Sequence, residues 1–283
     1  MSNSNQKEIL YAVYKKGHGS WDETYDIVRS KVAVTEDDLK TSKDDLDRLV
    51  SCDINMTTLV SENYPLSFKS DHSRPPFVFF YKGRLDLLKE TRGLGLVSFD
   101  VPSSLARRLL DKVVSDLNDF DDQVDVERLV MVYDESIKDI VLKATRRLPL
   151  VLFFLKGLDV LDEEEKGVAD IVIKRGGLVL SIVLPGVKKA AKMNKIDTYS
   201  CLIASVSSVY FPEYYSNKRG KKERIDQTIL SVALRVGRDI LVSPRGVYFD
   251  EVLESSHDDS NSLIKDGAII VFNKDSLKEA LSY

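Results

Sequence analysis

The sequence of 283 residues contains few of the residues that hold disulfide-bonded or metal-binding proteins together. It has two cysteines and three histidines, none of them at the spacing of a metal site. Cys52 and Cys201 lie far apart in the chain, which favours a reducing compartment and two structural thiols. The most apolar run, residues 148–155, is too short to cross a bilayer. These absences predict a cytoplasmic protein with no membrane contact and no cofactor.

Signatures of catalysis are also missing. No serine stands in a G-x-S-x-G turn, so nucleophilic catalysis has no motif. Neighbouring acids such as Asp134 and Glu135 are candidate Mg²⁺ ligands in principle, but acidic runs are usually solvated faces or helix N-termini. We therefore expect a binding protein and not an enzyme.

The composition is that of an ordinary globular protein, with 43% hydrophobic and 30% charged residues. The formal net charge of −4 gives no overall attraction to nucleic acid. Any binding of DNA would therefore need a local basic surface on an acidic background.

The sequence pattern changes near residue 63. Residues 1–63 contain short amphipathic stretches at helical spacing, which predicts a small helical N-terminal head. In residues 64–283, β-branched and aromatic runs alternate with helical patterns. Strands are expected at 77–81, 94–99, 128–132, 150–154, 178–183, 208–211, 240–243 and 268–271. Helices are expected at 103–118, 135–146, 162–174, 199–205 and 226–236.

Strands that are apolar throughout and separated by helices are typical of a parallel sheet covered on both faces. The sequence therefore predicts an α/β protein with a Rossmann-like, mostly parallel, doubly wound sheet.

Four stretches resemble, in the same order, motifs of the DprA/Smf DNA-processing family. Their residues are Asn63 to Leu66 with the PPFVFFYKG run at 75–83, Gly157-Leu158-Asp159, the GGLVLS run at 176–181 with Pro185-Gly186, and the GRDILVSPRG run at 237–246 with 261–268. The resemblance implies a Rossmann-like homodimer that binds single-stranded DNA. It also implies a partner, a RecA-type recombinase that the protein helps to load during DNA uptake by transformation and homologous recombination.

Two departures fall where that family has phosphate-binding turns. Residues 96–100 lack the glycine and arginine of the family's first turn, and residues 130–137 carry Asp134 and Glu135 in place of its second glycine-rich turn. Carboxylates there would repel a phosphate. The alternative is therefore a divergent sensor or scaffold on the same frame that binds a protein or a nucleotide-derived ligand and no DNA.

Two basic clusters are the candidate DNA-binding residues. Their lysines and arginines can neutralise phosphates in a salt-dependent way, and nearby tyrosines can stack on bases if they are exposed. Tyr210 and Phe211 are expected in the core, and Tyr214 and Tyr215 on the surface. The other interpretation is that the lysines form an ordinary solvated face. The candidate residues are Lys188, Lys189, Lys192, Lys195, Lys218, Arg219, Lys221, Lys222, Arg224, Tyr214 and Tyr215.

Three further arginines, Arg74, Arg84 and Arg92, flank the predicted strand at 77–81 or the turn after it. They are candidates for phosphate contacts at the carboxyl edge of the sheet, where ligands of open α/β sheets bind. Ion pairs with the many acids of the head are an equally good interpretation.

Overall fold

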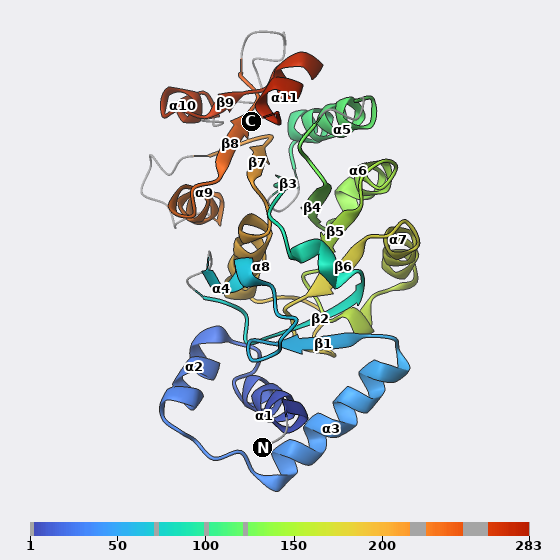
Figure 1. Ribbon diagram of the computed structural model, residues 1–283, viewed down its shortest axis with the longest axis vertical. Helices are drawn as coiled ribbons and strands as arrows, with labels where there is room; N and C mark the ends of the chain where they lie inside the picture. The colour runs from blue at the N-terminus through green and yellow to red at the C-terminus, as the bar shows by residue number, and fades with distance from the viewer. Residues whose placement is uncertain are drawn as a thin grey trace.

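The computed structural model describes residues 3–70, 74–98, 102–120, 124–215, 225–245 and 260–282. Within these residues the chain forms one nine-stranded sheet in the order β1-β2-β6-β5-β4-β3-β7-β8-β9 (Figure 1). Strands β3 to β9 run parallel to one another, and β2 and β1 are added antiparallel at one end. The predicted Rossmann-like, mostly parallel α/β sheet is confirmed.

Each expected strand is present, with its ends shifted by a few residues at most. The strands are β2 (Val78–Gly83), β3 (Gly93–Leu96), β4 (Arg128–Val132), β5 (Leu150–Phe153), β6 (Leu178–Ser181), β7 (Ser208–Phe211), β8 (Asp239–Val242) and β9 (Ile269–Ile270). Strand β1 (Asn55–Thr58) was not expected, because its sequence NMTT lacks the apolar character of the others.

Helices cover both faces of the sheet (Figure 1). One face carries α5 (Ser104–Asn118), α6 (Lys138–Ala144) after the short η2 (Glu135–Ile137), and α7 (Glu163–Lys174). The other carries α8 (Lys192–Ala204), α9 (Ile225–Arg235) and α4 (Leu66–Ser70). Helix α8 begins seven residues before the expected start, at Lys192. The chain ends with α10 (Ser260–Lys265) and α11 (Lys274–Ala280).

The order of the strands explains the continuous apolar runs. In β4, Leu129 and Met131 enter the core on one face, whereas Val130 and Val132 enter the core on the other. Alternate side chains of a strand point to opposite faces, so a strand covered on both sides must be apolar at every position. Strands β3 to β6 extend the sheet one way and β7 to β9 the other, which makes the pair β3 and β7 the point where the order reverses.

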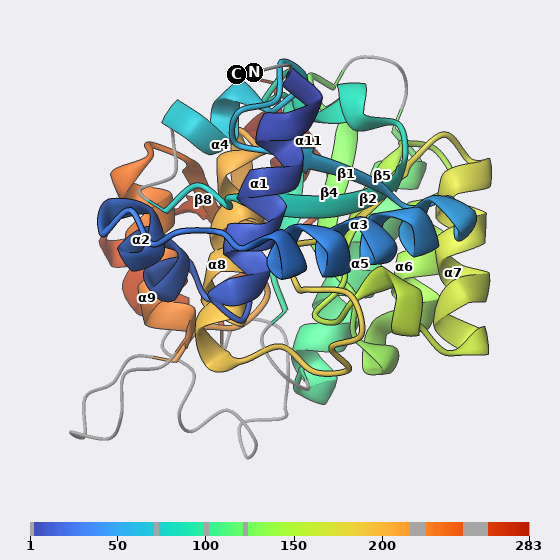
Figure 2. The ribbon, with the colours of Figure 1, turned by 90° about the horizontal axis from the view of Figure 1, so that it is seen from below.

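The head consists of α1 (Asn3–Lys16), α2 (Trp21–Arg29) and α3 (Glu36–Ser51), at the end of the sheet formed by β1 and β2 (Figures 1 and 2). The expected N-terminal helices are therefore confirmed. Strand β1 pairs with β2 across the expected boundary at residue 63, and the division into two domains stays a prediction. In the described part of the chain, no helix has both the length and the apolar character needed to cross a membrane.

Candidate nucleic-acid interface

The basic segment, residues 188–195, follows β6 at the carboxyl edge of the parallel strands, where open α/β sheets bind their ligands. Lys188 and Lys189 are exposed in the loop before α8, and Lys192 is exposed at the first position of that helix. Lys195 lies one turn later and is half-buried. The structure therefore brings the four lysines together on one loop and the first turn of one helix.

Two of the sequence motifs hold this loop in place. The carboxylate of Asp159 accepts hydrogen bonds from the backbone N–H of Gly186 at 2.9 and 3.0 Å. The backbone N–H of Gly157 donates to the carbonyl of Val187 at 2.8 Å, and that of Ala190 donates to the carbonyl of Leu155 at 2.8 Å. Residues 157–159 and 185–186, far apart in the sequence, thus form one anchor for the loop.

The first two lysines of the basic segment have no described counter-charge. Among the described residues, no carboxylate lies within ion-pair distance of Lys188 or Lys189. The first turn of α8 contains no acidic residue, and its N-terminus adds the partial positive charge of the helix dipole. This loop can therefore attract an anionic chain.

The second basic cluster lies outside the described residues: Lys218, Arg219, Lys221, Lys222 and Arg224. In the sequence, this cluster belongs to the segment between β7 and α9. Strand β7 is four places from β6 in the sheet, so the ends of the two strands are about 19 Å apart at a strand spacing of about 4.8 Å.

The expected exposure of the tyrosine pair is wrong for Tyr214. Its side chain is only 7% exposed and packs in the core on the α8 and α9 face of the sheet, because the chain stays against the protein after β7. Tyr215 is half-buried, and its hydroxyl donates to Oε2 of Glu213 at 3.1 Å. Tyr210 and Phe211 are fully buried, as expected.

A buried carboxylate lies at the point where the strand order reverses. Oε1 of Glu213, after β7, accepts a hydrogen bond at 3.3 Å from the backbone N–H of Ser103, the N-cap residue of α5. This position after the first parallel strand is where Rossmann-like proteins place a phosphate. Sequence reasoning missed Glu213 because its partner is 110 residues away.

The second departure from the family motifs, residues 130–137, also places a carboxylate at a strand end. Asp134 is the N-cap residue of η2, and its Oδ1 accepts from the N–H of Ser136 at 2.9 Å. The carboxylate therefore fills the turn after β4. Among the described residues, no group of three or more His, Cys, Asp or Glu side chains is placed to hold a metal ion.

The three further arginines all form ion pairs. Arg74 pairs with Asp22 of the head at 2.8 Å and with Asp197 of α8 at 3.2 Å. Arg84 pairs with Asp86 at 2.8 Å. Arg92 pairs with Asp125 and Glu127, which belong to the body. The expected ion pair with the head is therefore found for Arg74, whereas the described ion pairs of Arg84 and Arg92 are with acids of the body. Arg84 and Arg92 lie at the amino edge of the parallel strands and not at the expected carboxyl edge, because β2 runs antiparallel to β6 and Arg92 precedes β3.

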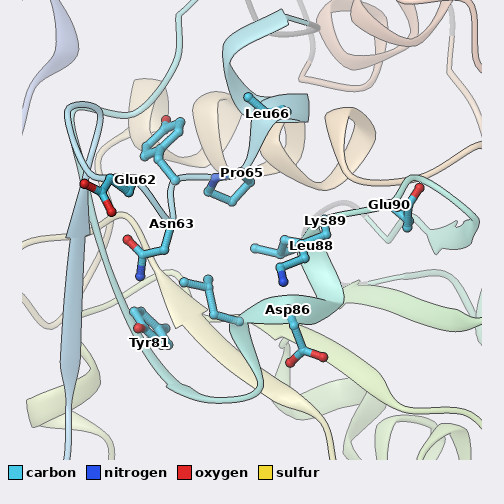
Figure 3. Close-up of a pocket in the computed structure, with 11 residues that line it drawn as sticks. Glu62, Asn63, Pro65, Leu66, Tyr81, Asp86, Leu88, Lys89 and Glu90 are labelled. Atoms are coloured by element: carbon cyan, nitrogen blue, oxygen red, sulfur yellow. The ribbon is translucent and has the colours of Figure 1, made fainter.

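A pocket of about 520 Å³ lies beside the first family motif (Figure 3). Pro65 and Leu66 line one side, and Tyr81 and Leu88 line another. The lining also includes the acids Glu62, Asp86 and Glu90, with Lys89 as its one basic residue. Its predominantly acidic charge makes this pocket a poor site for the phosphates of a nucleic acid.

Two solved structures with a similar fold each cover most of this chain. The DNA processing protein A (DprA) of Streptococcus pneumoniae superposes with a TM-score of 0.59 at 20% identity, over 98% of this chain and 93% of that one. This chain has the DprA fold. The DprA of Helicobacter pylori, described for its single-stranded DNA binding mode, superposes with a TM-score of 0.57 at 14% identity, over 81% of this chain and 95% of that one.

The DprA-like resemblance expected from the four motifs is therefore confirmed in the fold. No family model matches the sequence, and neither does any curated protein. Within this fold, the carboxylates of Glu213 and Asp134 accept hydrogen bonds from backbone N–H groups near the ends of β3 and β4.

Proposed function

We propose that this chain is a single-stranded DNA-binding protein of DprA type and not an enzyme. The observation that carries the proposal is the basic segment at the carboxyl edge of a DprA fold, with Lys188 and Lys189 exposed and without carboxylate partners in the described residues. The similar fold of the Helicobacter pylori protein, which has a single-stranded DNA binding mode, supports the choice of ligand.

The physical basis is the release of counterions. Each lysine that neutralises a phosphate frees the cations held by the strand, so binding weakens as the salt concentration rises. On the described surface, Lys188, Lys189 and Lys192 would provide this salt-dependent part of the affinity. We assign the same role to the cluster at 218–224. Tyr215 is the remaining candidate for stacking on a base, because Tyr214 is buried.

The assembly and setting that the DprA/Smf resemblance implies also belong to this proposal. They are a homodimer that helps to load a RecA-type recombinase in DNA uptake and homologous recombination, in the cytoplasm. The apolar face of α9, with Ile229 and Ala233 buried, packs on its own sheet. Because this apolar face is covered within the chain, it gives no evidence for a contact between two chains. The dimer is tested by measuring the mass of the protein in solution.

One observation favours a second candidate, the sensor or scaffold without DNA binding. Glu213 and Asp134 place carboxylates at two strand ends where a phosphate would bind in a Rossmann-like protein. A chain that replaced both phosphate sites with acids is also suited to a protein partner or a nucleotide-derived ligand without a phosphate at these positions.

Fluorescence anisotropy of labelled oligo-dT and of a matching duplex, across a salt series, distinguishes the two candidates. DNA binding predicts a preference for the single strand and an affinity that falls with salt. Each phosphate contact contributes about 0.7 to the slope of log K against log salt. The triple variant of Lys188, Lys189 and Lys192 to Ala should therefore lower the slope by up to about 2.

The matched control is a triple variant of Lys40, Lys43 and Lys265 to Ala, which removes the same charge from exposed positions on α3 and α10. It should bind as the unmodified protein does. A further variant of Lys218, Arg219, Lys221 and Lys222 to Ala tests the second cluster. Absence of oligo-dT binding even at low salt would overturn the proposal and favour the sensor or scaffold.

A further inference from the structure

A second concentration of positive charge lies at the opposite edge of the sheet from the basic segment. A pocket of about 470 Å³ opens at the amino ends of β5 and β6, and four of its lining residues are Arg84, Arg146, Arg147 and Arg175. Among the residues that the structure describes, no acidic one lines it. We call it the arginine pocket.

The topology of the sheet brings these arginines together. Arg146 and Arg147 precede β5, and Arg175 precedes β6. Arg84 follows β2, and because β2 runs antiparallel to β6, Gly83 pairs with Leu178 at the start of β6. Arg84 therefore reaches the same edge from the opposite direction, and its backbone N–H donates to the carbonyl of Gly177 at 3.1 Å.

Local contacts hold three of the guanidinium groups in place. Nη1 of Arg175 donates to Oγ1 of Thr145 at 2.5 Å and to the carbonyl of Leu142 at 3.3 Å. Nη1 of Arg147 donates to the carbonyl of Leu117 at 2.9 Å. The guanidinium of Arg84 is held by the carboxylate of Asp86. Arg84 and Arg175 keep further N–H donors, since a guanidinium has five.

Arg146 differs from the other three. It is exposed, and no described carboxylate or carbonyl lies within bonding distance of its guanidinium. The guanidinium of Arg84, by contrast, is paired with the carboxylate of Asp86. Like charges that share a pocket repel one another, and an anion placed among them removes that cost.

We propose that the arginine pocket binds a phosphate group. The planar fork of a guanidinium matches the spacing of phosphate oxygens and forms two parallel hydrogen bonds with them. The phosphate comes either from a free nucleotide or from the end of a nucleic-acid strand. The site is separate from the basic segment, which lies at the carboxyl edge, and it does not depend on the function proposed above.

The test uses the full chain and four probes: inorganic pyrophosphate, ATP, and oligo-dT with a 5′-phosphate or with a 5′-hydroxyl. Calorimetric titration at low salt should show binding of at least one phosphate-bearing probe, with an affinity that falls as salt rises. The double variant of Arg84 and Arg146 to Gln should lower that affinity by at least about tenfold, because it removes two charge-assisted contacts.

The matched control changes Arg29 and Lys40 to Gln, two exposed cations of the head. This control should bind the probes as the unmodified protein does. Binding of ATP or pyrophosphate that only the Arg84 and Arg146 variant loses identifies a free anion as the ligand. If the protein prefers the 5′-phosphate over the 5′-hydroxyl oligonucleotide, and only the Arg84 and Arg146 variant loses this preference, the ligand is the end of a strand.

Two results would overturn the proposal: no binding of any phosphate-bearing probe above that of the 5′-hydroxyl oligonucleotide, or equal binding by the unmodified protein and the double variant. Binding of the 5′-hydroxyl oligonucleotide tests the basic segment instead. It should be unchanged in the Arg84 and Arg146 variant, so failure of one proposal does not imply failure of the other.

Discussion

Nε of Arg74 lies 3.2 Å from Oδ1 of Asp197, and this buried carboxylate of α8 is thereby joined to the head through Asp22, the other partner of Arg74. Burial raises the pKa of Asp197 to about 6, although the charge and hydrogen bond of Arg74 act in the opposite direction. The folded chain therefore binds a proton at this site at a higher pH than the unfolded chain does.

The sign of the resulting pH dependence follows from linkage. As the pH falls from about 7 to about 4, the folded state takes up a proton at Asp197 before the unfolded state does, so this group raises the free energy of unfolding. The gain is up to about 3 kcal/mol, since one pKa unit corresponds to about 1.4 kcal/mol. We expect Asp197→Asn to remove this gain, measured by urea denaturation at several pH values.

The control for this measurement is Asp22→Asn, which removes the exposed partner of Arg74 and leaves the buried carboxylate in place. It should keep most of the pH dependence of the unmodified protein, because burial raises the pKa of Asp197 more than the charge of Asp22 does. If the free energies of unfolding of Asp197→Asn and of the unmodified protein differed by the same amount at every pH, burial would not raise the pKa of Asp197.

A second prediction concerns Gly83, where β2 ends against the start of β6. Its φ is +91°, and a Cβ built there would lie 2.4 Å from the carbonyl oxygen of Gly177. Gly83→Ala should lower the free energy of unfolding by at least about 2 kcal/mol, because both the backbone angle and the backbone contact oppose a side chain.

Gly167→Ala is the matched comparison for Gly83. Gly167 lies in α7 with no atom within 4 Å of the position of a Cβ, so alanine should stabilise the protein by about 0.5–1 kcal/mol. Thermal denaturation measures both variants. If Gly83→Ala and Gly167→Ala changed the thermal stability equally, β2 would not approach the turn before β6 as closely as the structure shows.

The third prediction concerns Arg128, whose side chain is 2% exposed at the start of β4. Its Nη2 donates to the carbonyl of Ser205 at 2.7 Å and also to that of Glu90, and burial lowers its pKa. Arg128→Lys should lower the free energy of unfolding by about 1–3 kcal/mol, because one ammonium group does not reproduce the guanidinium contacts of a buried site.

Chemical denaturation checks this value, with Arg29→Lys on the exposed surface of α2 as the control. The control should change the stability by less than about 0.5 kcal/mol. If the two variants were equally stable, the contacts of Arg128 with the two carbonyls would contribute nothing measurable.

The fourth prediction uses Trp21, the one tryptophan of the chain. Its indole N–H donates to the carbonyl of Pro75 at 3.0 Å, and its ring stacks on Tyr25 and lies below Arg74. These contacts connect the head to residues beyond the expected boundary at 63. We therefore expect the head and the body to unfold together.

Intrinsic fluorescence reports the surroundings of Trp21, and far-ultraviolet circular dichroism reports the helices of the whole chain. The two signals should give the same midpoint in a urea titration. A fluorescence transition at clearly lower urea would instead show that the head unfolds first.

The sequence by itself determined the strands of the body, because a strand buried on both faces must be apolar at every position. The apolar runs around Val130 and Val151 therefore predicted strands β4 and β5. The polar strand β1 was not predicted, because it lacks such a run. The helices α4, α10 and α11 were not predicted either. The motif order also predicted the DprA fold at an identity where no family model matches.

Only the tertiary structure decided the contacts between residues distant in the chain. It placed Glu213 against Ser103 and buried Tyr214, and it gathered Arg84, Arg146 and Arg175 at one edge of the sheet. Local patterns record whether a residue is apolar and how it repeats along the chain. The neighbours of a side chain across the sheet depend on strand order and direction, which no local pattern contains.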